Sequence, residues 1–156
     1  MKKISKIRSG GQTGVDRAAL DIAKQYSIDI CGWCPKGGRA EDYPPSLLLK
    51  YPELTETPFE KEEQRTVWNV RDSDATLILP RGGNSKGTVL TQKAAETLKK
   101  PFLVSTGESK EIIEWLNTLP QRLDLNIAGP RESECPGVYK STVSLLNEVL
   151  SDMWRE

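Results

Sequence analysis

The sequence predicts a doubly wound α/β domain with a parallel sheet, and three observations support this fold class. Short apolar segments alternate with segments of helical periodicity, a pattern typical of right-handed βαβ units. Residues 75–79, Ala-Thr-Leu-Ile-Leu, lack polar alternation, as expected for a strand that is buried on both faces. Two glycine-rich loops each follow an expected strand and precede an expected helix.

The individual elements follow from this alternation. An apolar-leaning run predicts the first strand at residues 4–8. Apolar residues at helical spacing then predict a helix to about residue 26: Val15, Ala18, Ala19, Ile22 and Ala23. Further strands are expected at residues 28–32, 75–79, 102–105 and 125–129, and further helices at residues 59–72, 88–99, 110–119 and 137–154. Residues 34–58 are rich in proline and have no sustained period, which predicts a long functional loop.

Composition limits the classes of protein and partner. A chain of 156 residues fits one domain, residues 1–156. Lys plus Arg and Asp plus Glu number 22 each, so we expect no general attraction for nucleic acid or a membrane surface. The start of the sequence lacks a signal-peptide pattern, which predicts a cytoplasmic protein. Three cysteines and no histidine favour reduced thiols and no directly coordinated metal.

The first glycine-rich loop, residues 9–14, connects the first strand to the first helix. Gly10 and Gly11 allow close approach of the main chain to a phosphate, and the helix N-terminus after them favours an anion. The spacing matches neither a dinucleotide fingerprint nor a Walker A loop. The alternative is a tight turn that only packs the helix on the strand. Asp16 and Arg17 in the first helical turn are candidate ligand-binding residues, or they could instead cap the helix and pair locally.

The second loop, residues 82–88, repeats this arrangement and ends at Thr88, whose hydroxyl could cap the next helix or bind a phosphate oxygen. Arg81 could add an anion contact or remain solvated. Ligands of open parallel sheets bind where the strand order reverses. Two such loops therefore predict one shared cleft at the carboxyl ends of the strands.

Three further segments carry candidate residues. Residues 34–42 combine two cations, two glycines and two carboxylates, which suits an oxyanion clamp or a solvated polar loop: Lys36, Gly37, Gly38, Arg39, Glu41 and Asp42. Arg131 and Glu132 follow the last strand and could reach the cleft or cap the final helix. Cys31 and Cys34 have redox spacing, but Pro35 does not begin a helix as a thioredoxin-type motif requires.

Five segments together resemble the putative molybdenum carrier family. They read GGQTGVDRAALDIA, WCPKGGRAEDYP, RTVWNVRDSDATLIL, GGNSKGTVLT and LNIAGPRES, and they span residues 9–133. That family resembles the wider LOG-like, or lysine-decarboxylase-like, group. The resemblance implies a Rossmann-like doubly wound parallel sheet of about five strands flanked by helices. It also implies a cleft for molybdenum cofactor or a nucleotide-type phosphate ligand, and a homo-oligomer, either a dimer or a tetramer.

The resemblance also assigns site residues. The first loop would hold the ligand phosphate through Gly10, Gly11, Gln12, Thr13 and Gly14. The middle of the ligand would contact Lys36, Arg39, Glu41 and Asp42. Arg65 and Asn69, on the helix before the third strand, and Asp74, just before that strand, would support or face the cleft. The opposite wall would consist of Gly82, Gly83, Gly87 and Thr88.

The function predicted from these features is a binding or carrier protein for an anionic, phosphate-bearing cofactor. An alternative is a nucleotide N-glycosidase that uses Glu41 or Asp42, and another is a sensor of a nucleotide-derived messenger. Related phosphoribohydrolases have a catalytic glutamate three residues after a glycine-threonine pair, where this chain has Thr91. A hydroxyl cannot replace that carboxylate, so the same reaction is not expected. Trp115 and Trp154 could anchor the core or an interface.

Overall fold

The computed structural model describes residues 3–79 and 85–153 and has two parallel sheets. The main sheet contains β1 (Ile4–Arg8), β2 (Asp29–Cys31), β5 (Ala75–Ile78), β6 (Phe102–Val104) and β7 (Leu123–Ala128). The smaller sheet pairs β3 (Trp33–Cys34) with β4 (Thr55–Glu56). The helices are α1 (Val15–Gln25), α2 (Leu47–Lys50), α3 (Glu62–Asp72), α4 (Lys86–Thr97), α5 (Ser109–Asn117) and α6 (Val138–Met153). The predicted Rossmann-like fold class is confirmed.

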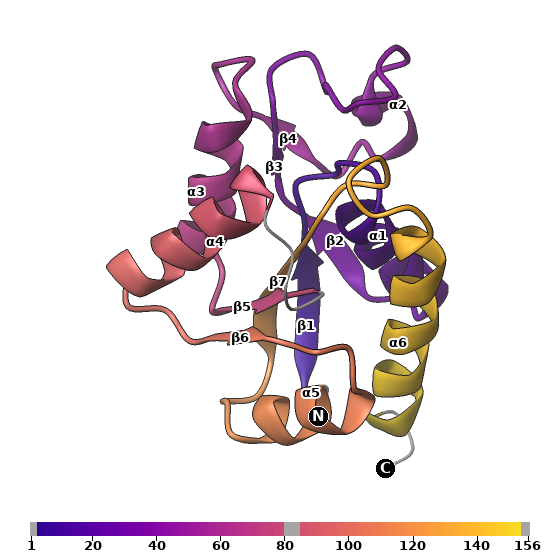
Figure 1. The fold of residues 1–156 in the computed structure, drawn as a ribbon, viewed down its shortest axis with the longest axis vertical. Coiled ribbons are helices and arrows are strands. Elements are labelled where there is room, and N and C mark those ends of the chain that lie inside the picture. The colour runs from indigo at the N-terminus through magenta and orange to yellow at the C-terminus, as the bar shows by residue number, and fades with distance from the viewer. Residues whose placement is uncertain (1–2, 80–84, 154–156) are drawn as a thin grey trace.

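The last strand in the sequence lies in the middle of the main sheet. The spatial order is β2-β1-β7-β5-β6, and β7 pairs in parallel with both β1 and β5. Figure 1 shows that the start of β1 and the end of α6 lie at the same end of the molecule. If the chain were closed there and read from β5, the strand order would become 2-1-3-4-5, the flavodoxin-like doubly wound order.

Two groups of helices cover the sheet (Figure 1). α6 packs against both α1 and α5 on one face, and α3 packs against α4 on the other. The helix after β7 and the helix after β5 therefore lie on opposite faces. A crevice is expected between such strands at their carboxyl ends.

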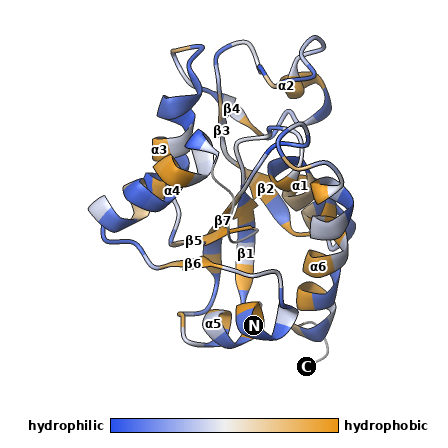
Figure 2. Ribbon diagram, in the orientation of Figure 1, coloured by the Kyte–Doolittle hydropathy of each residue, from blue (hydrophilic) through white to orange (hydrophobic). Residues whose placement is uncertain are grey.

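Hydrophobic burial explains why these segments form these elements. Every residue of β5 is buried, as its lack of polar alternation predicts. α1 buries one face, on which Val15, Ala19 and Ile22 join the main core. Figure 2 shows hydrophobic residues concentrated on the strands, while the helices carry both hydrophobic and hydrophilic residues. Trp115 is partly buried and packs against the main core, and Trp154 lies outside the described residues.

The segment predicted as one long loop contains local structure. β3, α2 and β4 all fall within or beside residues 34–58, so the prediction of an irregular loop is wrong there. Leu47, Tyr51 and Leu54 enter the main core, and the Tyr51 hydroxyl donates to Asp21 of α1 at 2.5 Å. Elements of two to four residues are too short to produce a detectable periodicity, although their buried side chains hold the segment against α1.

Gly129, directly after β7, is confined by backbone and is expected to tolerate no side chain. A Cβ there would lie 1.8 Å from the Leu79 carbonyl oxygen and 2.7 Å from Val15 Cγ2. We expect Gly129→Ala to lower the free energy of unfolding by about 3 kcal/mol, measured by urea denaturation.

Gly87→Ala is the matched control, because a Cβ at this helical position meets nothing within 4 Å. It should keep the stability or raise it by up to about 1 kcal/mol. Equal urea midpoints for the two variants would contradict the close approach at Gly129.

Candidate functional site

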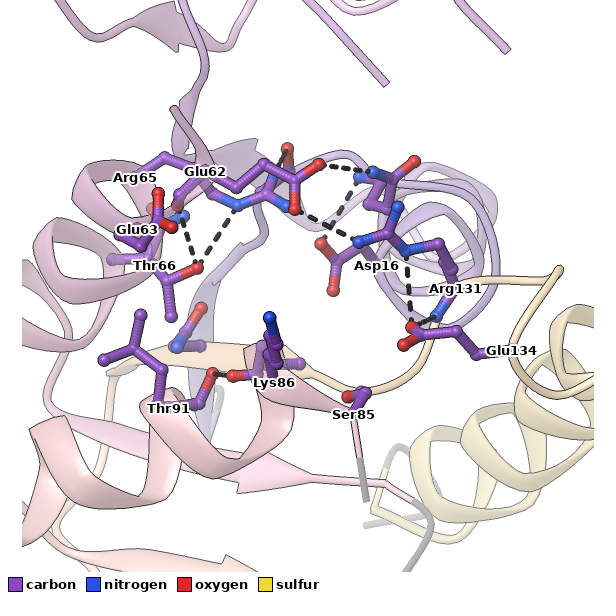
Figure 3. A pocket seen from close by; sticks show the side chains of 18 residues that line it. Asp16, Glu62, Glu63, Arg65, Thr66, Ser85, Lys86, Thr91, Arg131 and Glu134 are labelled. Atoms are coloured by element: carbon purple, nitrogen blue, oxygen red, sulfur yellow. Dashed lines mark hydrogen bonds and ion pairs between the residues drawn. The ribbon is translucent and has the colours of Figure 1, made fainter. Parts of the chain in front are cut away.

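A cavity of about 430 Å³ lies at the carboxyl ends of β1 and β7, beside the start of α4. Figure 3 shows charged side chains from α3, α1 and the β7–α6 connection on one side of it and the first turns of α4 on the other. Its lining consists of Gly10, Gln12, Asp16, Glu62, Glu63, Arg65, Thr66, Asn69, Ser85, Lys86, Gly87, Leu90, Thr91, Asn126, Ala128, Gly129, Arg131 and Glu134.

The two glycine-rich loops meet at this cavity as far as the described residues show. Gly10 and Gln12 come from the first loop, and Lys86 and Gly87 come from the described part of the second. The position agrees with the crevice expected between β7 and β5. Gly82 and Gly83, which were predicted to bind the ligand, lie outside the described residues, as does Arg81.

The amides of the first loop are largely occupied by the loop's own side chains. Gly11 N donates to Ser9 Oγ at 3.2 Å, Gln12 N to Asp16 Oδ2 at 3.3 Å, and Thr13 N to Gln12 Oε1 at 3.0 Å. The expected open row of phosphate-binding amides is therefore absent at these three described positions. An anion could reach them only by displacing a bond that is already made.

Gly11 and Gly14 are needed for backbone conformation and packing. Their φ angles are +78° and +80°, values that side chains disfavour. A Cβ at Gly11 would lie 2.8 Å from Leu47 Cδ1, and one at Gly14 would lie 2.5 Å from the Pro130 carbonyl oxygen. Neither residue lines the cavity. The positions of these two glycines therefore fit the alternative of a tight turn that packs the helix on the strand.

The start of α4 provides the helix N-terminus of the site. Ser85 is the N-cap and accepts from Thr88 N at 3.1 Å, so Ser85 performs the capping role that was considered for Thr88. Thr88 is buried and its hydroxyl contacts Ser85 Oγ at 2.6 Å. The Thr91 hydroxyl donates to the Gly87 carbonyl at 2.7 Å. The first-turn N–H groups of a helix have no acceptor within the helix, which makes this end favourable for an anion.

α3 supplies the facing wall. Arg65 is buried, and its Nη1 donates to the Gly10 carbonyl at 2.9 Å. Asn69 is also buried, but its Oδ1 accepts from Trp33 N at 2.8 Å and its Nδ2 donates to Trp33 O at 3.0 Å. Arg65 therefore holds the first loop at the cavity, whereas the amide of Asn69 holds β3 in place.

Asp16 is a buried carboxylate in the cavity wall. Its residue is 7% exposed, and Figure 3 shows its carboxylate directed into the space between α3 and α4. Desolvation raises the pKa of Asp16 to about 6, against the opposing effect of Arg65. A carboxyl group with such a pKa can change its protonation state near neutral pH.

Several acidic lining residues were missed by the sequence analysis. Glu62 accepts from Gln12 Nε2 at 3.3 Å and from Arg131 Nη2 at 3.2 Å, while Arg131 Nε also lies 3.3 Å from Glu134 Oε1. Arg131 thus reaches the cavity as predicted but is shared by two carboxylates. The spacing of Glu62, Arg65 and Asn69 on one face of α3 was an available signal.

The charged segment at residues 36–42 lies outside the cavity lining. Arg17 binds Asp42 through two hydrogen bonds of 2.9 and 3.0 Å, and Glu41 accepts from the Thr13 and Ser133 hydroxyls. Arg39 lies 3.6 Å from Glu60. The main chain of this segment is also engaged: Lys36 N donates to Phe59 O at 2.9 Å and Gly37 N to Glu56 Oε1 at 3.4 Å.

The carboxylates of this segment are held in their charged form. Burial opposes ionisation of Glu41, but hydrogen bonds from Ser133 and Thr13 lower its pKa below the usual value. The hydrogen bonds from Arg17 lower the pKa of Asp42. Both groups connect surface segments to the first loop and α1, and the structure does not bring them into the cavity as catalytic candidates.

Asp74 lies at the amino ends of the strands, whereas the cavity lies at their carboxyl ends. It immediately precedes β5, so it marks the amino end of that strand. Its N–H donates to the Asp124 carbonyl at 2.8 Å, and its Oδ2 accepts from Asp124 N at 2.8 Å. The expectation that Asp74 supports or faces the cleft is corrected: it joins β5 to the start of β7.

No disulfide joins the cysteines in this structure. Cys31, Cys34 and Cys135 are free thiols. Burial raises the pKa of Cys31 and raises that of Cys34 to about 11, which disfavours the reactive thiolate.

Across residues 3–79 and 85–153, no three Cys, Asp or Glu side chains are grouped to hold a metal ion. No helix in those ranges has the length and apolar character that crossing a bilayer requires.

The raised pKa of Asp16 predicts a pH dependence of stability. The folded state holds this proton more tightly than the unfolded state, whose carboxyl has the ordinary pKa of 3.8. The contribution of Asp16 to stability therefore falls as pH rises from about 4 to about 6 and remains lower above that range.

Asp16→Asn removes this titration while keeping a similar shape. The stability of the variant relative to the native protein should increase between pH 4 and pH 7 by an amount on the order of 2 kcal/mol, measured by urea denaturation at each pH. A difference that is constant over this range would contradict the assigned environment of Asp16.

Comparison with known proteins places this chain in a family. The crystal structure of the putative molybdenum carrier protein from Syntrophus aciditrophicus SB matches with a TM-score of 0.86 and 40% sequence identity, covering 96% of each chain. None of the curated proteins matches. The family model of the circularly permutated YpsA SLOG family matches residues 7–150. The central position of β7 is consistent with such a permutation, and the chain belongs to the circularly permutated YpsA SLOG family.

Proposed function

We propose that this protein binds and carries an anionic, phosphate-bearing small molecule, either molybdenum cofactor or a nucleotide-type ligand, in the cavity between α3 and α4. The observation that carries the proposal is the convergence of the α4 N-terminus with Arg65, Lys86 and Arg131 around one cavity. The name of the relative from Syntrophus aciditrophicus, a putative molybdenum carrier protein, supports the carrier role.

The size of the cavity favours an organic phosphate over a bare oxyanion. Its volume of about 430 Å³ falls in the range of small-molecule sites. A pterin or a nucleoside attached to a phosphate uses this space, whereas a single tetrahedral oxyanion leaves most of it to water.

The charges of the lining agree with a ligand that has two kinds of polar group. Three cations, Arg65, Lys86 and Arg131, face four carboxylates: Asp16, Glu62, Glu63 and Glu134. Attraction of an anion therefore depends on the local cations and the helix N-terminus and not on the net charge of the cavity. The carboxylates can accept hydrogen bonds from the hydroxyl or amino groups of a pterin or ribonucleoside.

Binding fits the cavity better than hydrolysis of an N-glycosidic bond by the expected residues. Glu41 and Asp42 are outside its lining and hold Thr13, Ser133 and Arg17. Thr91 lines the cavity, but a hydroxyl does not supply the carboxylate that such a reaction requires. A messenger sensor would use the same binding chemistry and differs from a carrier only in the identity of its ligand.

Calorimetry tests the proposal with molybdenum cofactor and with adenosine 5′-monophosphate as separate probes. At least one should bind with a submillimolar dissociation constant, and mass spectrometry of the natively purified protein should identify a ligand of the same chemistry. Absence of binding heat for both probes, together with absence of a co-purifying anion, would refute the proposal.

Lys86→Gln tests where the anion lies. Lys86 lines the cavity at the first position of α4, where its charge adds to that of the helix N-terminus. We expect the variant to weaken binding of the probe that gives heat by roughly three- to tenfold in calorimetry.

Lys93→Gln is the matched control, since Lys93 is exposed on the same helix and outside the cavity lining. It should change the affinity by less than about twofold. Equal losses in the two variants would indicate a diffuse charge effect and would contradict binding at the start of α4.

A further inference from the structure

The carboxylate of Asp16 occupies the position of an anion on the first loop. Its Oδ2 accepts the Gln12 N–H at 3.3 Å, beside the cavity into which the carboxylate is directed (Figure 3). Amides after a strand and before a helix are where an external anion is expected to bind. In this chain an internal carboxylate takes that place, so a bound anion and the charged form of Asp16 would compete for the same donor.

The backbone N–H of Gln12 is held rigidly in this orientation, because hydrogen bonds of the Gln12 side chain and of Ser9 fix the loop around it. The Gln12 Oε1 accepts from Thr13 N at 3.0 Å and from Glu41 N at 2.7 Å, and its Nε2 donates to Glu62. On the other side, Ser9 Oγ donates to the Asp16 carbonyl at 2.8 Å. The donor therefore stays in place when its acceptor changes. A length of 3.3 Å is also beyond the usual range of N–H···O bonds, which indicates a weak bond.

The negative charge of Asp16 is only weakly balanced by nearby positive groups. None of the ion pairs formed among the described residues includes it. The charged groups that act on it are Arg65 and Glu62 of α3 and Arg17 of its own helix. Lys86 of α4, with Arg131 and Glu134 of the β7–α6 connection, faces the same cavity. Arg65 Nη1 donates to the Gly10 carbonyl, so part of its hydrogen-bonding capacity is already used.

We propose that Asp16 couples anion binding to proton uptake: the carboxylate takes one proton from solvent, releases the Gln12 N–H, and a phosphate oxygen of the ligand accepts that N–H in its place. The new carboxylic O–H can donate to the same ligand. No covalent bond of the ligand is formed or broken. This inference rests on the proposed function, and it assigns to Asp16 control of when the cavity accepts its ligand.

The proton balance gives the expected direction. Burial raises the pKa of Asp16 to about 6, so most molecules carry the charged form at pH 7.5. An incoming negative charge raises that pKa further and favours proton uptake. The affinity for an anion should therefore increase as pH falls from 8 to 6. Asp16→Asn removes the competing charge, and the variant should bind roughly tenfold more tightly at pH 7.5.

The test is calorimetry of adenosine 5′-monophosphate binding at pH 7.0 in buffers of different ionisation enthalpy, which counts the protons taken up. The native protein should take up about one half to one proton more than Asp16→Asn. The ligand's own phosphate titration contributes to both proteins and largely cancels in the difference. Glu96→Gln removes one exposed charge from α4 outside the cavity lining and should retain the native proton count.

The outcomes separate this inference from the proposed function. Greater uptake by the native protein, with tighter binding by Asp16→Asn, supports the coupling. Equal uptake by the two proteins, or a variant that binds more weakly, overturns the coupling while the binding function stands. Absence of binding heat in both proteins with this probe and with molybdenum cofactor overturns the proposed function and the coupling together.

Discussion

The insertion of β7 between β1 and β5 determines where the cavity lies. β7 hydrogen-bonds both neighbours, and Gly129 at its end lies so close to the Leu79 carbonyl and Val15 that a Cβ would overlap them. This packing brings the first loop, the start of α4 and the β7–α6 connection to one edge of the sheet. The helices after β7 and β5 then cover opposite faces, and the cavity lies at the carboxyl end of β7, between α3 and the start of α4.

The first loop both packs against its neighbours and lines the cavity. Gly11 and Gly14 adopt positive φ angles to pack against Leu47 and the Pro130 carbonyl, whereas Gly10 and Gln12 reach the cavity. Because Asp16 accepts the Gln12 amide, the loop is complete without a ligand. In the proposed binding mode, the start of α4 and the cations around it attract the anion, and exchange at Gln12 sets how firmly it is held.

Local patterns were readable from the sequence, and long-range relations were not. The buried strand β5 and the helix α1 were predicted because each produces a pattern among neighbours in the chain. The central position of β7 depends on pairing between distant segments. The bond between Gln12 and Asp16 and the reach of Glu62 to Arg131 depend on how the loops fold. Asp74 was misplaced because a residue before a strand lies at its amino end.

The most direct measurement of the central claim is the amide chemical shifts of the ¹⁵N-labelled protein during titration with adenosine 5′-monophosphate and with molybdenum cofactor. If the anion binds where the loops converge, the amides of Gln12, Lys86 and Gly87 should shift together and saturate at one ligand concentration. Saturating shifts confined to the open groove between α5 and α6, around Ser109, Glu148 and Asp152, with these three amides unchanged, would contradict the account.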